Sequence, residues 1–111
     1  MTGITTHVLD LAAGTPAAGI AVTLEREAGG SWQVVAQAAT DADGRVREAF
    51  GAAGGAGRYR LTFASGAWFA ARGIASFHPE IVVAFEVREA GRHHHVPLLL
   101  SAFGYTTYRG S

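Results

Sequence analysis

The sequence contains no cysteine and no lysine. The absence of cysteine excludes disulfide scaffolds, thiolate zinc sites and cysteine nucleophiles. All nine basic residues are arginines, and nine acidic residues balance them. Such a chain has no net attraction to polyanions, so we expect neither nucleic acid nor a membrane surface as a partner.

Long hydrophobic runs are also missing. No apolar stretch approaches the ~18 residues of a membrane span, and no basic segment followed by an apolar run opens the chain. These features predict a protein of the cytoplasm. The 111 residues suffice for one hydrophobic core, and no linker or repeat divides them, so we expect a single domain over residues 1–111.

The common nucleophile and phosphate motifs are absent as well. The sequence has no Gly-x-Ser-x-Gly elbow, no P-loop, no Gly-x-Gly-x-x-Gly after a strand and no His-Glu-x-x-His. Covalent catalysis by serine is therefore disfavoured.

Apolar residues alternate with a period of two along most of the chain, and glycine or aspartate clusters separate the runs. This pattern predicts strands over residues 4–10, 20–25, 32–39, 46–50, 58–63, 80–87 and 92–101, with strand propensity again over 105–111. Small helix formers predict one short helix over residues 67–72 with Ser65 as its N-cap, and residues 51–57 are expected to form a flexible loop. Seven to eight strands with one short helix indicate an all-β protein, a β-sandwich.

Strand parity divides the histidines between two environments. In the last long strand, His94 alternates with Val96, Leu98 and Leu100, which favours a core position, whereas His93 and His95 point to the opposite face. In the first strand, His7 lies on the face away from Ile4, Thr6 and Val8.

Each of these residues also has a purely structural interpretation. His7 is a candidate for a hydrogen-bonded structural histidine, His93 and His95 for surface residues, and Arg45 for a solvated turn residue after Asp43-Gly44. Taken as a group, however, His, Arg and Tyr side chains can activate water and stabilise an oxyanion.

Three separated motifs join these pieces. The sequence resembles the transthyretin-like 5-hydroxyisourate hydrolases at three places. These are residues 6–10 with Gly14-x-Pro16-Ala17, the turn at residues 43–45, and residues 93–101 followed by Tyr-Arg-Gly-Ser at 108–111. Departures from the family pattern are modest: Ala102 replaces a usual Pro, Thr107 a common Ser, and His94 a frequent Tyr.

The resemblance implies a transthyretin-like β-sandwich that forms a homotetramer with sites at the dimer-dimer interface. It also implies hydrolysis of 5-hydroxyisourate to 2-oxo-4-hydroxy-4-carboxy-5-ureidoimidazoline, without a cofactor or a metal. The positions that match the family's active site are His7, Arg45 and His95 as catalytic residues and Tyr108, Arg109 and Ser111 as substrate-binding residues. As a hypothesis, neutral His95 or His7 takes a proton from water while Arg45 holds the developing oxyanion.

Two alternatives belong to other functional classes. One is a transthyretin-type protein that binds a small ligand without catalysis; vertebrate transthyretins resemble this family but lack the terminal tetrapeptide, whose presence here favours the enzyme. The other is a metal protein in which His7, His93 and His95 supply three imidazole ligands.

Overall fold

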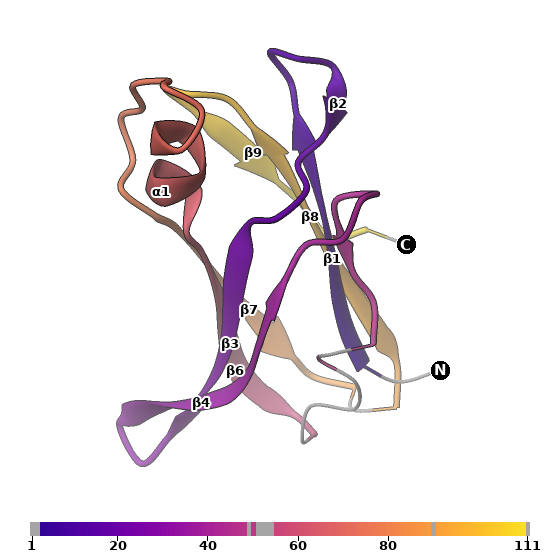
Figure 1. Ribbon diagram of the computed structural model, residues 1–111. Helices are drawn as coiled ribbons and strands as arrows, with labels where there is room; N and C mark the ends of the chain where they lie inside the picture. Colours follow the sequence, from indigo (N-terminus) through magenta and orange to yellow (C-terminus); the bar gives the residue numbers. More distant parts are fainter. Residues whose placement is uncertain (1–2, 49, 51–54, 90, 111) are drawn as a thin grey trace.

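A computed structural model describes residues 3–48, 50, 55–89 and 91–110 (Figure 1). These residues form nine strands and one helix. The elements are β1 (Gly3–Asp10), β2 (Thr15–Pro16), β3 (Ala21–Ala28), β4 (Ser31–Ala39), β5 (Arg45–Val46), β6 (Gly57–Phe63), α1 (Ser65–Ala70), β7 (Ile81–Val87), β8 (His93–Leu100) and β9 (Tyr105–Thr107).

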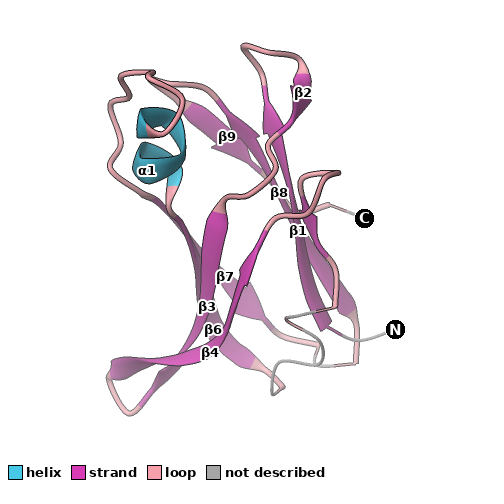
Figure 2. Ribbon diagram, viewed as in Figure 1, coloured by secondary structure: helices cyan, strands magenta, loops and turns pink. Residues whose placement is uncertain are grey.

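The strands form two sheets that face each other, with α1 at one end (Figure 2). One sheet has the order β2-β1-β8-β9, with β5 also paired to β1, and the other has the order β4-β3-β6-β7. The predicted all-β sandwich with one short helix is confirmed. No helix in the described part of the chain is long and apolar enough to span a membrane.

The core lies between the sheets and consists of the strand faces that parity predicted. The residues concerned are Ile4, Thr6 and Val8 of β1, Val22 and Leu24 of β3, Tyr59, Leu61 and Phe63 of β6, and His94, Val96, Leu98 and Leu100 of β8, all of them buried. Each fully buried large aliphatic or aromatic side chain contributes about 1.5–3 kcal/mol. The opposite faces of β1 and β8 are thereby turned away from the core.

β1 and β8 lie side by side in parallel, although they come from opposite ends of the sequence (Figure 1). Their register places Gly3 opposite His93, Thr5 opposite His95 and His7 opposite Pro97. Because the register is uninterrupted, the outward-facing residues of the two strands form one continuous surface.

The structure corrects the predicted helix. Helix α1 begins at Ser65, not at residue 67, and ends at Ala70; Ala64 is the N-cap and makes no side-chain cap hydrogen bond. The first turn is held instead by the Gly66 N–H, which donates to the Pro79 carbonyl (3.1 Å). The predicted capping role of Ser65 is wrong because its hydroxyl is buried, with no partner among the described residues.

The predicted strand over residues 46–50 is also shorter than expected. Only Arg45–Val46 pairs with β1, and the chain then turns to bury Phe50 in the core. Ala49 and residues 51–54 of the predicted loop lie outside the described residues, and Gly57 already belongs to β6. The two-residue strand β2 lies where the sequence indicated only a turn.

Candidate active site

A tight turn between β4 and β5 sets the position of Arg45. The Asp41 carboxylate accepts hydrogen bonds from the backbone N–H groups of Asp43 and Arg45, both at 2.9 Å. Gly44 has φ +76, and a Cβ there would overlap the carbonyl oxygen of Val8. The turn therefore requires glycine on two grounds, backbone conformation and close approach.

The same turn joins the outer surface of β1. The Val8 N–H donates to the Gly44 carbonyl (2.7 Å), and β5 pairs with β1 so that Arg45 is opposite His7. The N–H donors of Arg45 and Asp43 also lower the pKa of the Asp41 carboxyl. Asp41 is thus ionised near neutral pH and available to hold the turn.

His95 lies one strand over, on β8, and is tied to Thr5. The Thr5 hydroxyl oxygen is 2.8 Å from His93 Nε2 and 2.8 Å from His95 Nδ1. The two imidazole rings stack with their centroids 6.4 Å apart and an interplanar angle of 23°. One hydroxyl group therefore connects both outward-facing histidines of the last long strand.

A polar groove of about 670 Å³ lies over this part of the sheet. It is lined by Thr5, Thr6, Arg45, Arg47, Glu48, His93 and His95. His7 is two residues from Thr5 along β1, on the same face, and directly opposite Arg45. The groove is large enough for a small heterocyclic ligand and offers it imidazole, guanidinium and hydroxyl groups.

Both His7 and His95 are held in the neutral form near pH 7. Burial lowers the pKa of His7, and the nearby charge of Arg45 lowers it further. Burial likewise lowers the pKa of His95, followed by the charges of Arg45, His93 and His7. These mutual effects place Arg45 and the two histidines in one electrostatic cluster, which is suited to accepting a proton and binding an anion.

The C-terminal segment packs against His95. The Gly110 N–H donates to the His95 carbonyl (2.8 Å), and a Cβ at Gly110 would lie 2.5 Å from Cδ2 of the His95 ring. Only glycine allows the tail to pass this close to the imidazole. Ser111, predicted to bind substrate, lies outside the described residues.

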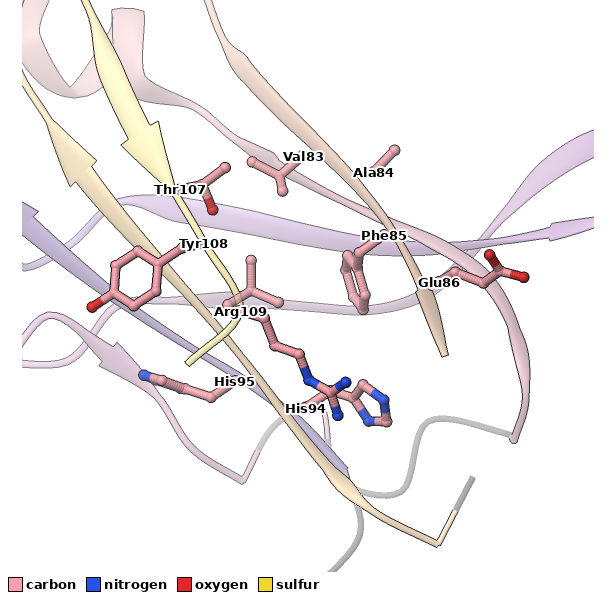
Figure 3. A pocket seen from close by; sticks show the side chains of 10 residues that line it. Val83, Ala84, Phe85, Glu86, His94, His95, Thr107, Tyr108 and Arg109 are labelled. Carbon is pink, nitrogen blue, oxygen red and sulfur yellow. The ribbon is translucent and has the colours of Figure 1, made fainter. Parts of the chain in front are cut away.

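Tyr108 and Arg109 leave the backbone in different directions (Figure 3). Tyr108 points to the same side as His95, whereas Arg109 points toward His94 and Phe85 at the mouth between the two sheets. There the residues line a separate cavity of about 240 Å³, which His95 and Tyr108 also border. Arg109 does not line the groove that contains Arg45.

The structure thus brings His7, Arg45 and His95 together, as the sequence analysis expected of a site. Tyr108 and Arg109 border the smaller cavity together with His95, and neither of them lines the groove that contains Arg45. Thr5 is not among the site residues predicted from the sequence. The one available signal was its shared parity with His7 in the first strand, but its pairing with His95 depends on the parallel register.

The three-histidine metal site gains no support. Within the described residues, no three side chains of the types His, Cys, Asp or Glu are placed to hold a common metal ion. Two of the proposed ligands instead direct ring nitrogens at the Thr5 hydroxyl.

Comparison with known proteins identifies the family. A model of the HIUase/Transthyretin family matches residues 4–110. The chain belongs to this family. It is 47% identical, over 115 aligned residues that cover both chains fully, to the 5-hydroxyisourate hydrolase of Caulobacter vibrioides.

The solved structures that this chain resembles include a 5-hydroxyisourate hydrolase and a transthyretin. The 5-hydroxyisourate hydrolase of Klebsiella pneumoniae is 40% identical, with a TM-score of 0.88 and full coverage of both chains. Sea bream transthyretin, in a complex with thyroxine, is 33% identical, with a TM-score of 0.91 over 96% of this chain and 93% of that one. The resemblance seen in the motifs is confirmed, but the fold by itself does not separate catalysis from ligand carriage.

Proposed function

We propose that this chain hydrolyses 5-hydroxyisourate to 2-oxo-4-hydroxy-4-carboxy-5-ureidoimidazoline, with His7, Arg45 and His95 as the catalytic residues. The full-length similarity to proteins named 5-hydroxyisourate hydrolase bears out an enzyme of this type. The observation that carries the choice of residues is the cluster of two neutral imidazoles and one guanidinium beside a polar groove.

The reaction proceeds by attack of water on an acyl carbon of the six-membered ring. The water oxygen bonds to that carbon, and a neutral imidazole takes the released proton. The carbonyl oxygen becomes an oxyanion, which the Arg45 guanidinium stabilises by about 3 kcal/mol if it acts as one oxyanion donor. The C–N bond then breaks, and the imidazolium returns its proton to the departing ring nitrogen.

We assign substrate binding to Tyr108, Arg109 and Ser111. The position of Tyr108 on the same side as His95 supports this role. Arg109 is separated from the polar groove within one chain, so its contact with substrate requires either movement of the tail or a site that extends into the cavity shared by His95, Tyr108 and Arg109. We further propose that the protein is a homotetramer in the cytoplasm, with sites formed by more than one subunit.

The second candidate is a small-ligand carrier, favoured by the high TM-score with sea bream transthyretin. A carrier needs no proton acceptor, whereas both histidines here are kept neutral beside an arginine. Tight binding of an aromatic ligand without ring opening would support the carrier.

The decisive experiment follows the ultraviolet absorbance of freshly prepared 5-hydroxyisourate with and without the protein. We expect the protein to accelerate decay far above the spontaneous rate and His7→Gln to remove most of that acceleration. Product identity is checked by NMR of the reaction mixture. Decay at the spontaneous rate with the wild-type protein would rule out the hydrolase.

A further inference from the structure

We propose that Thr5 and His93 fix His95 in the tautomer that carries its hydrogen on Nε2, so that His95 donates a hydrogen bond during hydrolysis and His7 is the base. This inference rests on the proposed function and separates the roles of the two histidines. It makes Thr5 and His93 positioning residues, because both act through His95.

The Thr5 hydroxyl forms a bridge between His93 and His95, and the number of hydrogens in this bridge is fixed. A threonine hydroxyl has one hydrogen to donate, and here its oxygen is 2.8 Å from one ring nitrogen on either side. A neutral imidazole has one N–H and one bare nitrogen. Thr5 therefore donates to one histidine and accepts from the other, or it accepts from both and leaves its own hydrogen unpaired.

The far nitrogen of His93 decides among these arrangements. His93 Nδ1 is buried and has no hydrogen-bond partner within the described residues. If Thr5 donated to His93 Nε2, the N–H of the His93 ring would be on Nδ1, where it would be buried without an acceptor. Buried N–H groups without partners are rarer in proteins than incompletely paired acceptors. His93 therefore carries its hydrogen on Nε2 and donates to Thr5.

The hydroxyl hydrogen of Thr5 then has one destination. Thr5 is nearly buried, and the two histidines are its side-chain hydrogen-bond partners in the described structure. If His95 also donated to Thr5, the hydroxyl hydrogen would have no acceptor. With Thr5 donating to His95 Nδ1, every hydrogen of the bridge is used, and His95 carries its own hydrogen on Nε2.

The consequence for His95 is chemical. Its Nδ1 lone pair is occupied by Thr5, and its Nε2 is protonated, so it has no free lone pair with which to take a proton from water. Within the described residues nothing else bonds to Nε2, and His95 borders the polar groove. Its Nε2–H can therefore donate to the carbonyl oxygen of a substrate and to the oxyanion that forms there.

His7 takes no part in the hydrogen bonds through Thr5. A neutral imidazole has one N–H and one bare nitrogen, so His7 keeps a lone pair that can accept a proton. The charged groups around this ring are Arg45, Arg47 and Asp43, and burial with Arg45 keeps His7 neutral. In the reaction, the water proton moves to the bare nitrogen of His7 as the water oxygen bonds to carbon. The same proton passes to the ring nitrogen as the C–N bond breaks.

The direct test is a two-bond ¹H–¹⁵N NMR spectrum of protein labelled with ¹⁵N-histidine, in which protonated and bare ring nitrogens have well-separated shifts. His95→Gln and His93→Gln assign the two sets of signals. We expect Nε2 to be protonated and Nδ1 bare in both residues. Protonated Nδ1 in His95 overturns the proposal, whatever the activity of the enzyme.

Variants of Thr5 test its role in positioning His95. In Thr5→Val we expect the His95 signals to shift toward a mixture of tautomers and kcat to fall about 10- to 100-fold, as for other residues that orient a reactive histidine. Thr5→Ser retains the hydroxyl and should keep kcat within about threefold. Thr62→Val makes the same substitution on the other sheet and should change neither the His95 signals nor kcat. Unchanged His95 signals and kcat in folded Thr5→Val overturn the proposal.

Glutamine substitutions separate donor from base. A glutamine amide N–H can replace an Nε2–H donor but cannot replace a base, so His95→Gln should retain at least about tenfold more activity than His7→Gln, since loss of a general base costs about 10²- to 10⁴-fold. The reverse order overturns the proposal while leaving the hydrolase activity in place. If the wild type fails to hydrolyse 5-hydroxyisourate, the proposed function fails, and the NMR result still decides the tautomers.

Discussion

Arg45 has two effects on the candidate site that act together. Its charge is available for the oxyanion, and the same charge lowers the pKa of both His7 and His95. A base whose conjugate acid is destabilised remains unprotonated in mildly acidic solution. In the proposed mechanism, the residue that stabilises the transition state therefore also keeps the base unprotonated.

The pH profile of an Arg45 variant tests this coupling. In Arg45→Gln we expect kcat/KM to fall about 100-fold through loss of the oxyanion partner. The Arg45 charge helps to lower the pKa of His7 in the wild type. Removing that charge should therefore raise the pKa of His7 toward 6.5 and move the acid limb of the profile to higher pH. Arg58→Gln, on the other sheet, is the control. An acid limb that stays in place would show that Arg45 does not set the pKa of the base.

Gly110 provides a second prediction at this scale. In Gly110→Ala the new Cβ would lie 2.5 Å from the His95 ring, so the tail or the ring must move. We expect kcat to drop at least about tenfold while the free energy of unfolding changes by less than about 1 kcal/mol, because the segment is at the surface.

Gly104→Ala is the matched control for this effect. Its new Cβ would be 3.9 Å from the nearest atom, Ser101 Oγ. Kinetics and urea unfolding of both variants measure the difference. Equal activity in the two would mean that the approach of the tail to His95 has no catalytic importance.

At the scale of elements, the turn over residues 41–45 is the part of the structure on which the site depends most. It carries Arg45 to the surface of β1, and it does so with a positive φ and a backbone contact to Val8. An alanine in place of Gly44 would therefore have both a strained backbone conformation and a steric overlap of its Cβ with the Val8 carbonyl oxygen.

We expect Gly44→Ala to destabilise the protein by about 2–4 kcal/mol, the sum of a left-handed backbone conformation and a steric overlap. Gly30→Ala in the β3–β4 hairpin, with φ +83 and no atom within 4 Å of the new Cβ, should cost only the conformational part, about 1–2 kcal/mol. Equilibrium denaturation of the two variants provides the comparison. Equal destabilisation would show that the Val8 carbonyl can move away at little cost.

Residues 108–111 form the C-terminal tail that follows β9. β9 ends at Thr107, and the residues after it contact the body through the bridge between Gly110 and His95. Removing residues 108–111 should abolish hydrolysis while the sheets stay folded, as judged by circular dichroism and a cooperative thermal transition. A truncated protein with normal turnover would make the tail dispensable for chemistry.

At the scale of the whole molecule, the proposed tetramer has a kinetic signature. If residues of more than one subunit complete each site, the activity per chain should fall when the protein is diluted below its dissociation constant. Light scattering after size exclusion should give four times the mass of one chain. Full activity in a monomeric fraction would contradict shared sites.

The sequence predicted the fold, and it predicted which face of each strand the candidate site residues occupy, because both depend on local regularities. Alternation placed His94 in the core and His95 opposite it, and the distinctive motifs at both ends indicated the family. It did not predict that Thr5 joins His93 and His95, because the partner strand of β1 is about 90 residues away and strand order is a property of the assembled sheet. It also missed the start of α1, since the Pro79 carbonyl that holds the first turn comes from a distant segment.

The parallel pairing of β1 and β8 has a consequence for biosynthesis. A ribosome must release residues 93–100 before β1 can acquire the strand beside it. Until then the nascent chain exposes an apolar strand face, and contacts between distant segments form slowly. The groups gathered around Thr5 are therefore among the last to assemble. A chain that terminates before β8 lacks the groove and cannot bind substrate there. Such a chain is expected to be bound by chaperones or degraded by proteases.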